Sequence, residues 1–234
     1  AKNLDGVQRL LNAHKMGELP ITIHGLQGSF LSVVMALLSK DHSGSILIVT
    51  PTEKEAELVA GDLRLFTQGQ VLELPWWGTL PYSRQPPLSS VYGRRADTLT
   101  RLMVADECVV VAPLRSFLTP IPDPSHIMAN TVKFGVGENV DPVRISEVLT
   151  NLGYLKVPRV TVPGEFSAKG EVIDIFSFGY EFAIRVVLDF DEIVKIRNFD
   201  PISQGSVGEV QQAQVSCVRE VLIGKHQIRV LKDR

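Results

Sequence analysis

The chain has 234 residues, of which 44% are hydrophobic and 21% charged, and its formal net charge is −2. This composition predicts one large or two ordinary globular domains and argues against a disordered chain. It gives no overall electrostatic case for nucleic-acid binding. No run approaches the roughly twenty apolar residues of a membrane helix, so we expect no membrane contact. Cys108 and Cys217 are far apart and lack metal-ligand spacing. We therefore expect a reducing, cytoplasmic setting without a disulfide framework.

Residues 1–120 alternate between buried-strand and helix patterns. Short β-branched or apolar runs predict strands, and periodic segments between them predict helices. The expected strands are 21–25, 45–50, 70–75 and 108–113, and the expected helices are 30–40, 53–66 (with Thr52 as a cap) and 93–105. Strands that are apolar on both faces suit a parallel sheet covered by helices. We therefore expect an α/β sheet with right-handed crossovers.

The alternation of strand and helix patterns stops at TPIPDPS (119–125), whose three prolines cannot continue a helix or a central strand. Beyond it, residues 131–137 read as an edge strand and residues 141–154 as a helix closed by glycine. Three further segments read as strands joined by tight turns: 157–178, 182–200 and 214–223. This order predicts a small α+β domain that is mainly antiparallel.

The first strand–helix junction is the place for a phosphate-binding loop, and its residues are GLQGSFLS (25–32). A working Walker A loop needs three residues at fixed spacing: a second glycine, a lysine and a hydroxyl residue. The glycine lets the backbone approach the phosphates, the lysine neutralises their charge, and the hydroxyl coordinates magnesium. Counted from Gly25, these positions hold Phe30, Leu31 and Ser32. Without the lysine, the loop should not hydrolyse ATP. The simpler alternative is a strand-to-helix turn that never bound nucleotide.

Other candidate chemistry is sparse. The five histidines show no metal-ligand spacing, and the GxSxG pattern of a nucleophile elbow is absent. An acidic group near one hairpin consists of Asp189, Asp191, Glu192 and Asp200. We interpret it as a solvated turn with ion-pair partners at Lys195 and Arg197, not as a metal site. We expect no cofactor, no metal and no catalytic residue.

Two stretches carry a family resemblance. The first is LELPWWGTLPYSRQPPLSSVYGRRADTLTRL (72–102), in which Trp77, Thr79, Leu80, Pro81, Tyr82 and Arg95 occupy the places of an aromatic-Pro loop followed by a helix. The second runs from GYLKVPRVTVPGEFSAKGEVIDIFSFG through IRVVLDFDEIVKIRNFD to SQ (153–204). Together they resemble the N-terminal, UvrB-homologous part of the bacterial transcription-repair coupling factor.

The resemblance implies two domains and the start of a third. Residues 1–122 would be a RecA-like domain without a working Walker A loop, and residues 123–210 a UvrA-binding α+β domain. Residues 211–234 would begin or return to a further subdomain. The family's contacts with RNA polymerase and DNA would lie in parts that this chain lacks.

The resemblance also implies which residues bind UvrA. Transferred position by position, they are Lys169 before the glycine, Arg185 before the D-E-I turn and Phe190. Lys169 stands where many relatives have arginine, and Phe190 is shifted by one position from the usual aromatic. The residues alone leave a second role open for Arg185, a cross-strand pair with a carboxylate.

Three functions remain in competition. The leading one is a non-catalytic adaptor that recruits UvrA in transcription-coupled nucleotide excision repair. The alternative is a UvrB-like or helicase-like ATPase with an unusual nucleotide site. The third is direct DNA binding through a basic patch of Arg94, Arg95 and Arg101, against which the overall charge argues.

Overall fold

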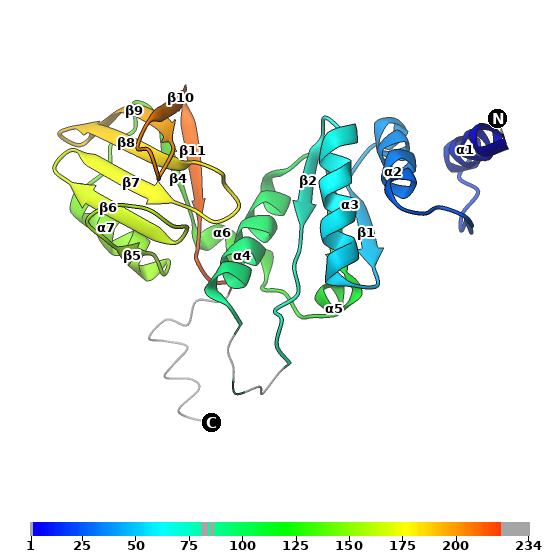
Figure 1. Ribbon diagram of the computed structural model, residues 1–234. Coiled ribbons are helices and arrows are strands. Elements are labelled where there is room, and N and C mark those ends of the chain that lie inside the picture. Colours follow the sequence, from blue (N-terminus) through cyan, green and yellow to red (C-terminus); the bar gives the residue numbers. More distant parts are fainter. Residues whose placement is uncertain (1, 81–83, 85–86, 221–234) are drawn as a thin grey trace. The chain divides into compact units, whose positions relative to one another are not determined.

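A computed structural model describes residues 2–80, 84 and 87–220 (Figure 1). The fold is mixed α/β, with one parallel sheet and one mainly antiparallel sheet. The chain forms two compact units, residues 1–76 with 104–119, and residues 77–103 with 120–234. The described residues contain no helix long and apolar enough to cross a membrane.

The first unit has a three-stranded sheet in the order β1-β3-β2, in which both outer strands run parallel to β3. Its strands are β1 (Ile46–Thr50), β2 (Gln70–Glu73) and β3 (Cys108–Pro113), and its helices are α1 (Lys2–Lys15), α2 (Ser29–Asp41), α3 (Glu53–Phe66) and α5 (Leu114–Phe117). The predicted strands 45–50, 70–75 and 108–113 are thereby confirmed. Helix α3 begins where expected, because the Thr52 hydroxyl accepts a hydrogen bond from the Glu55 amide at 3.3 Å.

The predicted strand at 21–25 is wrong. These residues form no regular structure, and within the described chain β1 is hydrogen-bonded to β3 only. A β-branched run becomes a strand only where a neighbouring strand supplies hydrogen bonds, and this segment has none. The core of the unit lies where α2 and α3 pack on one face of the sheet. Its buried residues are Ala36, Ala56, Val59, Ala60, Leu63, Val109 and Val111.

The second unit is built on a six-stranded sheet in the order β10-β9-β8-β7-β6-β5. The strands are β5 (Leu155–Lys156), β6 (Glu165–Lys169), β7 (Val172–Phe176), β8 (Ala183–Asp189), β9 (Glu192–Phe199) and β10 (Ser206–Val210). A separate antiparallel pair joins β4 (Thr131–Gly135) to β11 (Gln212–Ser216). The helices are α4 (Ser89–Val104), α6 (Pro124–Ala129) and α7 (Pro142–Asn151). Helix α4, which the sequence pattern placed in the first region, packs in this unit.

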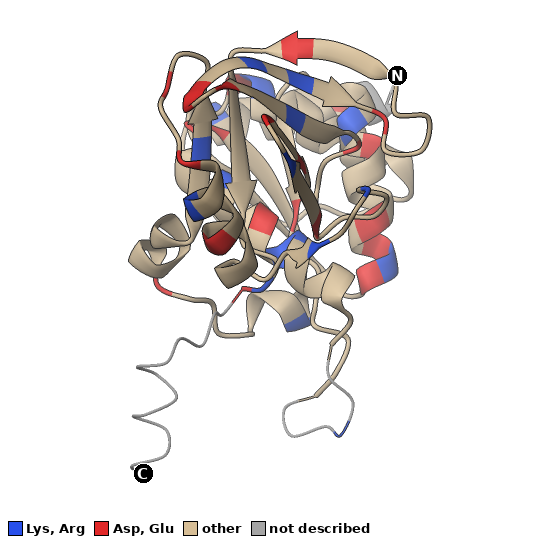
Figure 2. Cartoon of the chain, turned by 90° about the vertical axis from the view of Figure 1, so that its left-hand side faces the viewer, with Lys and Arg blue, Asp and Glu red and all other residues tan. Residues whose placement is uncertain are grey.

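The two faces of the six-stranded sheet differ. One face is the core, where α7 and the β4–β11 pair cover Phe166, Ile173, Ile175, Val186 and Ile196. The opposite face, here called the open face, consists of the residues that alternate with these: Lys169, Val172, Asp174, Arg185, Val187, Lys195 and Arg197. Figure 2 shows basic and acidic residues interspersed along the chain, not segregated by sign.

Candidate protein-interaction surface

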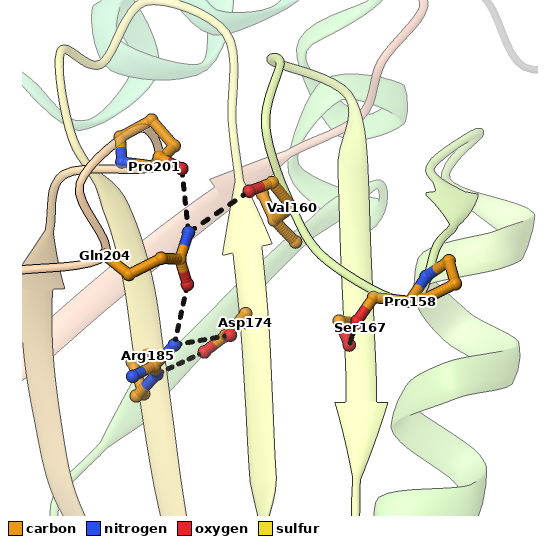
Figure 3. A network of polar contacts seen from close by, with 7 residues as sticks. All are labelled: Pro158, Val160, Ser167, Asp174, Arg185, Pro201 and Gln204. Carbon is orange, nitrogen blue, oxygen red and sulfur yellow. Dashed lines mark hydrogen bonds and ion pairs between the residues drawn. The ribbon is translucent and has the colours of Figure 1, made fainter.

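Arg185 lies at the centre of the open face and is held by Asp174 on the neighbouring strand. Its Nε donates to Asp174 Oδ1 at 2.6 Å, and its Nη2 donates to Oδ2 at 2.8 Å (Figure 3). The cross-strand pair that the sequence left as an alternative is therefore present. These hydrogen bonds raise the pKa of Arg185 above its ordinary value. Because 28% of the Arg185 side chain stays exposed, the guanidinium is fixed in orientation yet accessible.

A second contact fixes Arg185 from the side of the loop after β9. Gln204 has a left-handed backbone with φ 64°, and its amide nitrogen donates to the Pro201 carbonyl at 2.7 Å (Figure 3). Its amide oxygen accepts a long 3.4 Å hydrogen bond from Arg185 Nη2. The guanidinium carbon also lies 4.6 Å from the centre of the Phe199 ring. Phe199 belongs to a small cluster of buried side chains at this end of the sheet.

Lys169 lies on the same face as Arg185, at the end of β6. It is paired in register with Val172, which in turn faces Val187 on β8. Directly opposed residues on neighbouring strands share a face, so Lys169 and Arg185 point to the same side of the sheet. Lys169 is exposed. The structure thus brings together two of the three residues that the resemblance indicated.

Phe190 lies at the tip of the β8–β9 hairpin, beyond the last paired residues, Asp189 and Glu192. Its side chain is 83% exposed and its backbone has φ 54°, a conformation costly for a residue with a Cβ. The ladder between β8 and β9 shifts after Val187, where Val194 has no opposing residue. Phe190 itself lies in the turn between the paired residues Asp189 and Glu192, so its ring is presented at the hairpin tip and does not enter the core face.

The ion pairs expected between the acidic group and the basic residues of β9 are not found among the described residues. Lys195 instead pairs with Glu209 on β10. The reason is register, because Asp189 opposes Glu192, and the bulge places Lys195 opposite Val187. Asp200 serves the following turn, where its Oδ1 accepts from the Ile202 amide at 2.7 Å.

The loop at 25–32 leads into helix α2. Gly25 and Gly28 have left-handed backbones, with φ 84° and 55°. Leu31, at the position of the Walker lysine, packs against the core of the first unit. Ser32, at the position of the magnesium ligand, is fully buried, and its hydroxyl has no hydrogen-bond partner within the described chain.

The three arginines of the candidate DNA patch have different environments. Arg95 is fully buried, and its Nε donates to Glu220 Oε2 at 2.6 Å. Arg101 pairs with Asp97 at 3.0 Å, so only Arg94 remains as an exposed residue. A shared basic patch is therefore not formed.

The aromatic-Pro motif has a structural partner that sequence reasoning missed. Trp77 Nε1 donates to Glu220 Oε2 at 2.9 Å, and its ring centre lies 5.6 Å from the Arg95 guanidinium carbon. Glu220 is 125 residues from Arg95 and lies in no motif, so no local signal pointed to it. Pro81 and Tyr82 of this motif lie outside the described residues.

Sequence reasoning also missed Asp174 and Gln204 as the residues that hold Arg185. The available signal was strand alternation, since Asp174 falls on the polar face of the VIDIF run that contains it. Within the described chain there is no group of three or more His, Cys, Asp or Glu placed to hold a metal ion.

The second unit contains a match to a known protein family. Residues 132–220 match the family model described as the UvrB interaction domain. The chain is 29% identical to the transcription-repair-coupling factor of Borreliella burgdorferi over 91% of its own length and 19% of that protein's. The Escherichia coli factor is 24% identical over 89% of the chain and 18% of the relative. The Mycobacterium bovis factor is 34% identical over 71% and 14%.

The chain therefore spans about a fifth of the length of the first curated relatives that it matches. The resemblance indicated by the two sequence stretches is confirmed, and it extends over about nine-tenths of the chain.

Proposed function

We propose that this chain is the adaptor module of a transcription-repair coupling factor and that it recruits UvrA to nucleotide excision repair. The observation that carries the proposal is the match of residues 132–220 to the UvrB interaction domain, which lies within the unit that presents the open face. Lys169 and Arg185 on this face, with Phe190 at the adjoining hairpin tip, are the contact residues that we propose.

The chemistry of the surface supports a protein partner. A guanidinium held by Asp174 keeps one orientation, so little side-chain entropy is lost when it meets a carboxylate. Phe190 exposes a ring on a costly backbone conformation, a combination found where a side chain serves binding more than folding. A fixed charge beside an exposed aromatic is typical of an interface hot spot.

We also propose that the first unit is a RecA-like domain that does not bind nucleotide. Leu31 cannot neutralise a phosphate from within the core, and the buried Ser32 hydroxyl is not placed to reach magnesium. The module would then act without catalysis and without a cofactor. Contacts with RNA polymerase and DNA would belong to parts of the relatives that this chain does not span.

The test is binding to immobilised UvrA, measured for the parent chain and for two matched arginine variants. Arg185→Ala should weaken binding by about 30-fold or more, the equivalent of about 2 kcal/mol at an interface hot spot. Arg144→Ala removes an exposed arginine from helix α7, which covers the other face of the sheet, and should leave binding unchanged. Equal affinities for all three chains would show that the open face is not the binding surface.

A further inference from the structure

Arg197 occupies an unfavourable position on the open face. It is directly opposite Arg185 on one side and directly opposite Glu209 on the other. Its neighbour Ile196 is buried in the core, so the Arg197 side chain points to the open face. Like charges directly opposed on neighbouring strands destabilise a sheet, and Arg197 therefore repels Arg185.

The neighbouring carboxylates are engaged elsewhere. Both carboxylate oxygens of Asp174 accept hydrogen bonds from Arg185. Glu209, although opposite Arg197 in register, pairs with Lys195. Among the described residues Arg197 has no ion pair, and its Nε is buried without a hydrogen-bond partner. A buried N–H that has lost water and gained no acceptor costs free energy, and native proteins seldom keep one without a reason.

We propose that Arg197 is a further contact residue, which receives a carboxylate of the protein partner in a bidentate pair. This inference rests on the proposed function and deepens it. Arg185 already donates Nε and Nη2 to Asp174 and a long hydrogen bond from Nη2 to Gln204, which leaves Nη1 for a partner. The Arg197 Nε is buried, so a partner carboxylate would meet the two terminal nitrogens, which have no hydrogen bond within the described chain, and it would offset the repulsion from Arg185.

The proposed site has a defined chemistry. The partner group is an aspartate or glutamate side chain, since a phosphate or nucleic acid would favour a surface without interspersed Asp174 and Glu209. Binding should weaken with salt less steeply once Arg197 is removed, because one charge pair is lost.

The experiment compares substitutions at two basic residues of the same strand and face. Calorimetric titration with purified UvrA is run for the parent chain, Arg197→Met and Lys195→Met. Arg197→Met should weaken binding by about 30-fold or more, whereas Lys195→Met, whose lysine is already paired, should change it by less than about threefold. Arg197→Lys keeps the charge without the fork and should give an intermediate affinity.

Thermal unfolding of the free chains separates a binding role from a structural one. Arg197→Met removes a repulsion and a buried unpaired N–H, so its melting temperature should equal or exceed that of the parent. A fall of about 4 °C or more would mean that Arg197 supports the fold, and it would overturn the inference. Parent-like affinity of Arg197→Met would also overturn it while leaving the proposed function intact. Failure of the parent chain to bind UvrA would instead refute the proposed function, and this inference with it.

Discussion

Removal of Glu220 should destabilise the second unit severely. Glu220 and Arg95 form an ion pair in which 1% and 0% of the side chains are exposed, with Nε–Oε2 and Nη2–Oε1 distances of 2.6 and 2.9 Å. Loss of one partner of a buried pair costs about 3–5 kcal/mol, because the other charge stays away from water. The Trp77 indole also loses its acceptor, which adds about 1–3 kcal/mol. Glu220→Ala should therefore remove a large share of a typical stability of about 5–15 kcal/mol.

The assay is urea unfolding followed by tryptophan fluorescence. A Trp76→Phe background leaves Trp77 as the reporter of the second unit. The double variant Arg95→Met with Glu220→Leu should lose much less stability than Glu220→Ala, because no buried guanidinium is left that has lost its Glu220 carboxylate.

An exposed ion pair serves as the control. Glu209 pairs with Lys195 in the same unit, with 60% and 37% of the side chains exposed, and Glu209→Ala should cost no more than about 1 kcal/mol. A cost below about 1 kcal/mol for Glu220→Ala would refute the claim that this pair ties the end of the described chain to helix α4.

Three further predictions concern single residues of the two units. Gly93→Ala should destabilise the protein by about 1–3 kcal/mol in urea unfolding, because the added Cβ would lie 2.0 Å from the Phe178 ring. Gly61→Ala, whose Cβ would meet open space, should instead stabilise the protein by up to about 1 kcal/mol. Burial raises the pKa of Asp97 from 3.8 to about 6, so the protonated form favours the fold and this stability is lost as the pH rises through about 6. Asp97→Asn should abolish this part of the pH dependence of the free energy of unfolding. An unchanged slope of that free energy against pH would contradict the prediction. Phe190→Gly should stabilise the hairpin by up to about 1 kcal/mol in thermal unfolding while weakening UvrA binding, and a chain unaffected in both would contradict the role given to the tip.

Elements encoded by local sequence were predictable. The apolar run of β3 and the helix capped by Thr52 are determined by residues close in the sequence, and both lie where expected. The run 21–25 has equally good strand composition but no strand, because pairing depends on a partner that its own residues do not specify.

The candidate interaction surface was predictable in part, for the same reason. The family resemblance indicated Lys169 and Arg185 as contact residues, and the register places both on one face of the sheet. Three features depend on distant residues or on an irregular ladder: the Glu220 partner of Arg95, the capture of Glu209 by Lys195, and the bulge near Val194. No local pattern predicts these three features. The unpaired state of Arg197 follows from the bulge near Val194 and from the capture of Glu209 by Lys195.

Calorimetric titration of this chain with purified UvrA, run beside a titration with ATP and magnesium, decides between UvrA recruitment and nucleotide binding. We expect saturable binding to UvrA and no heat of binding with ATP. Binding of ATP without binding of UvrA would contradict this expectation, and a nucleotide-binding ATPase domain would then become the leading explanation of the first unit.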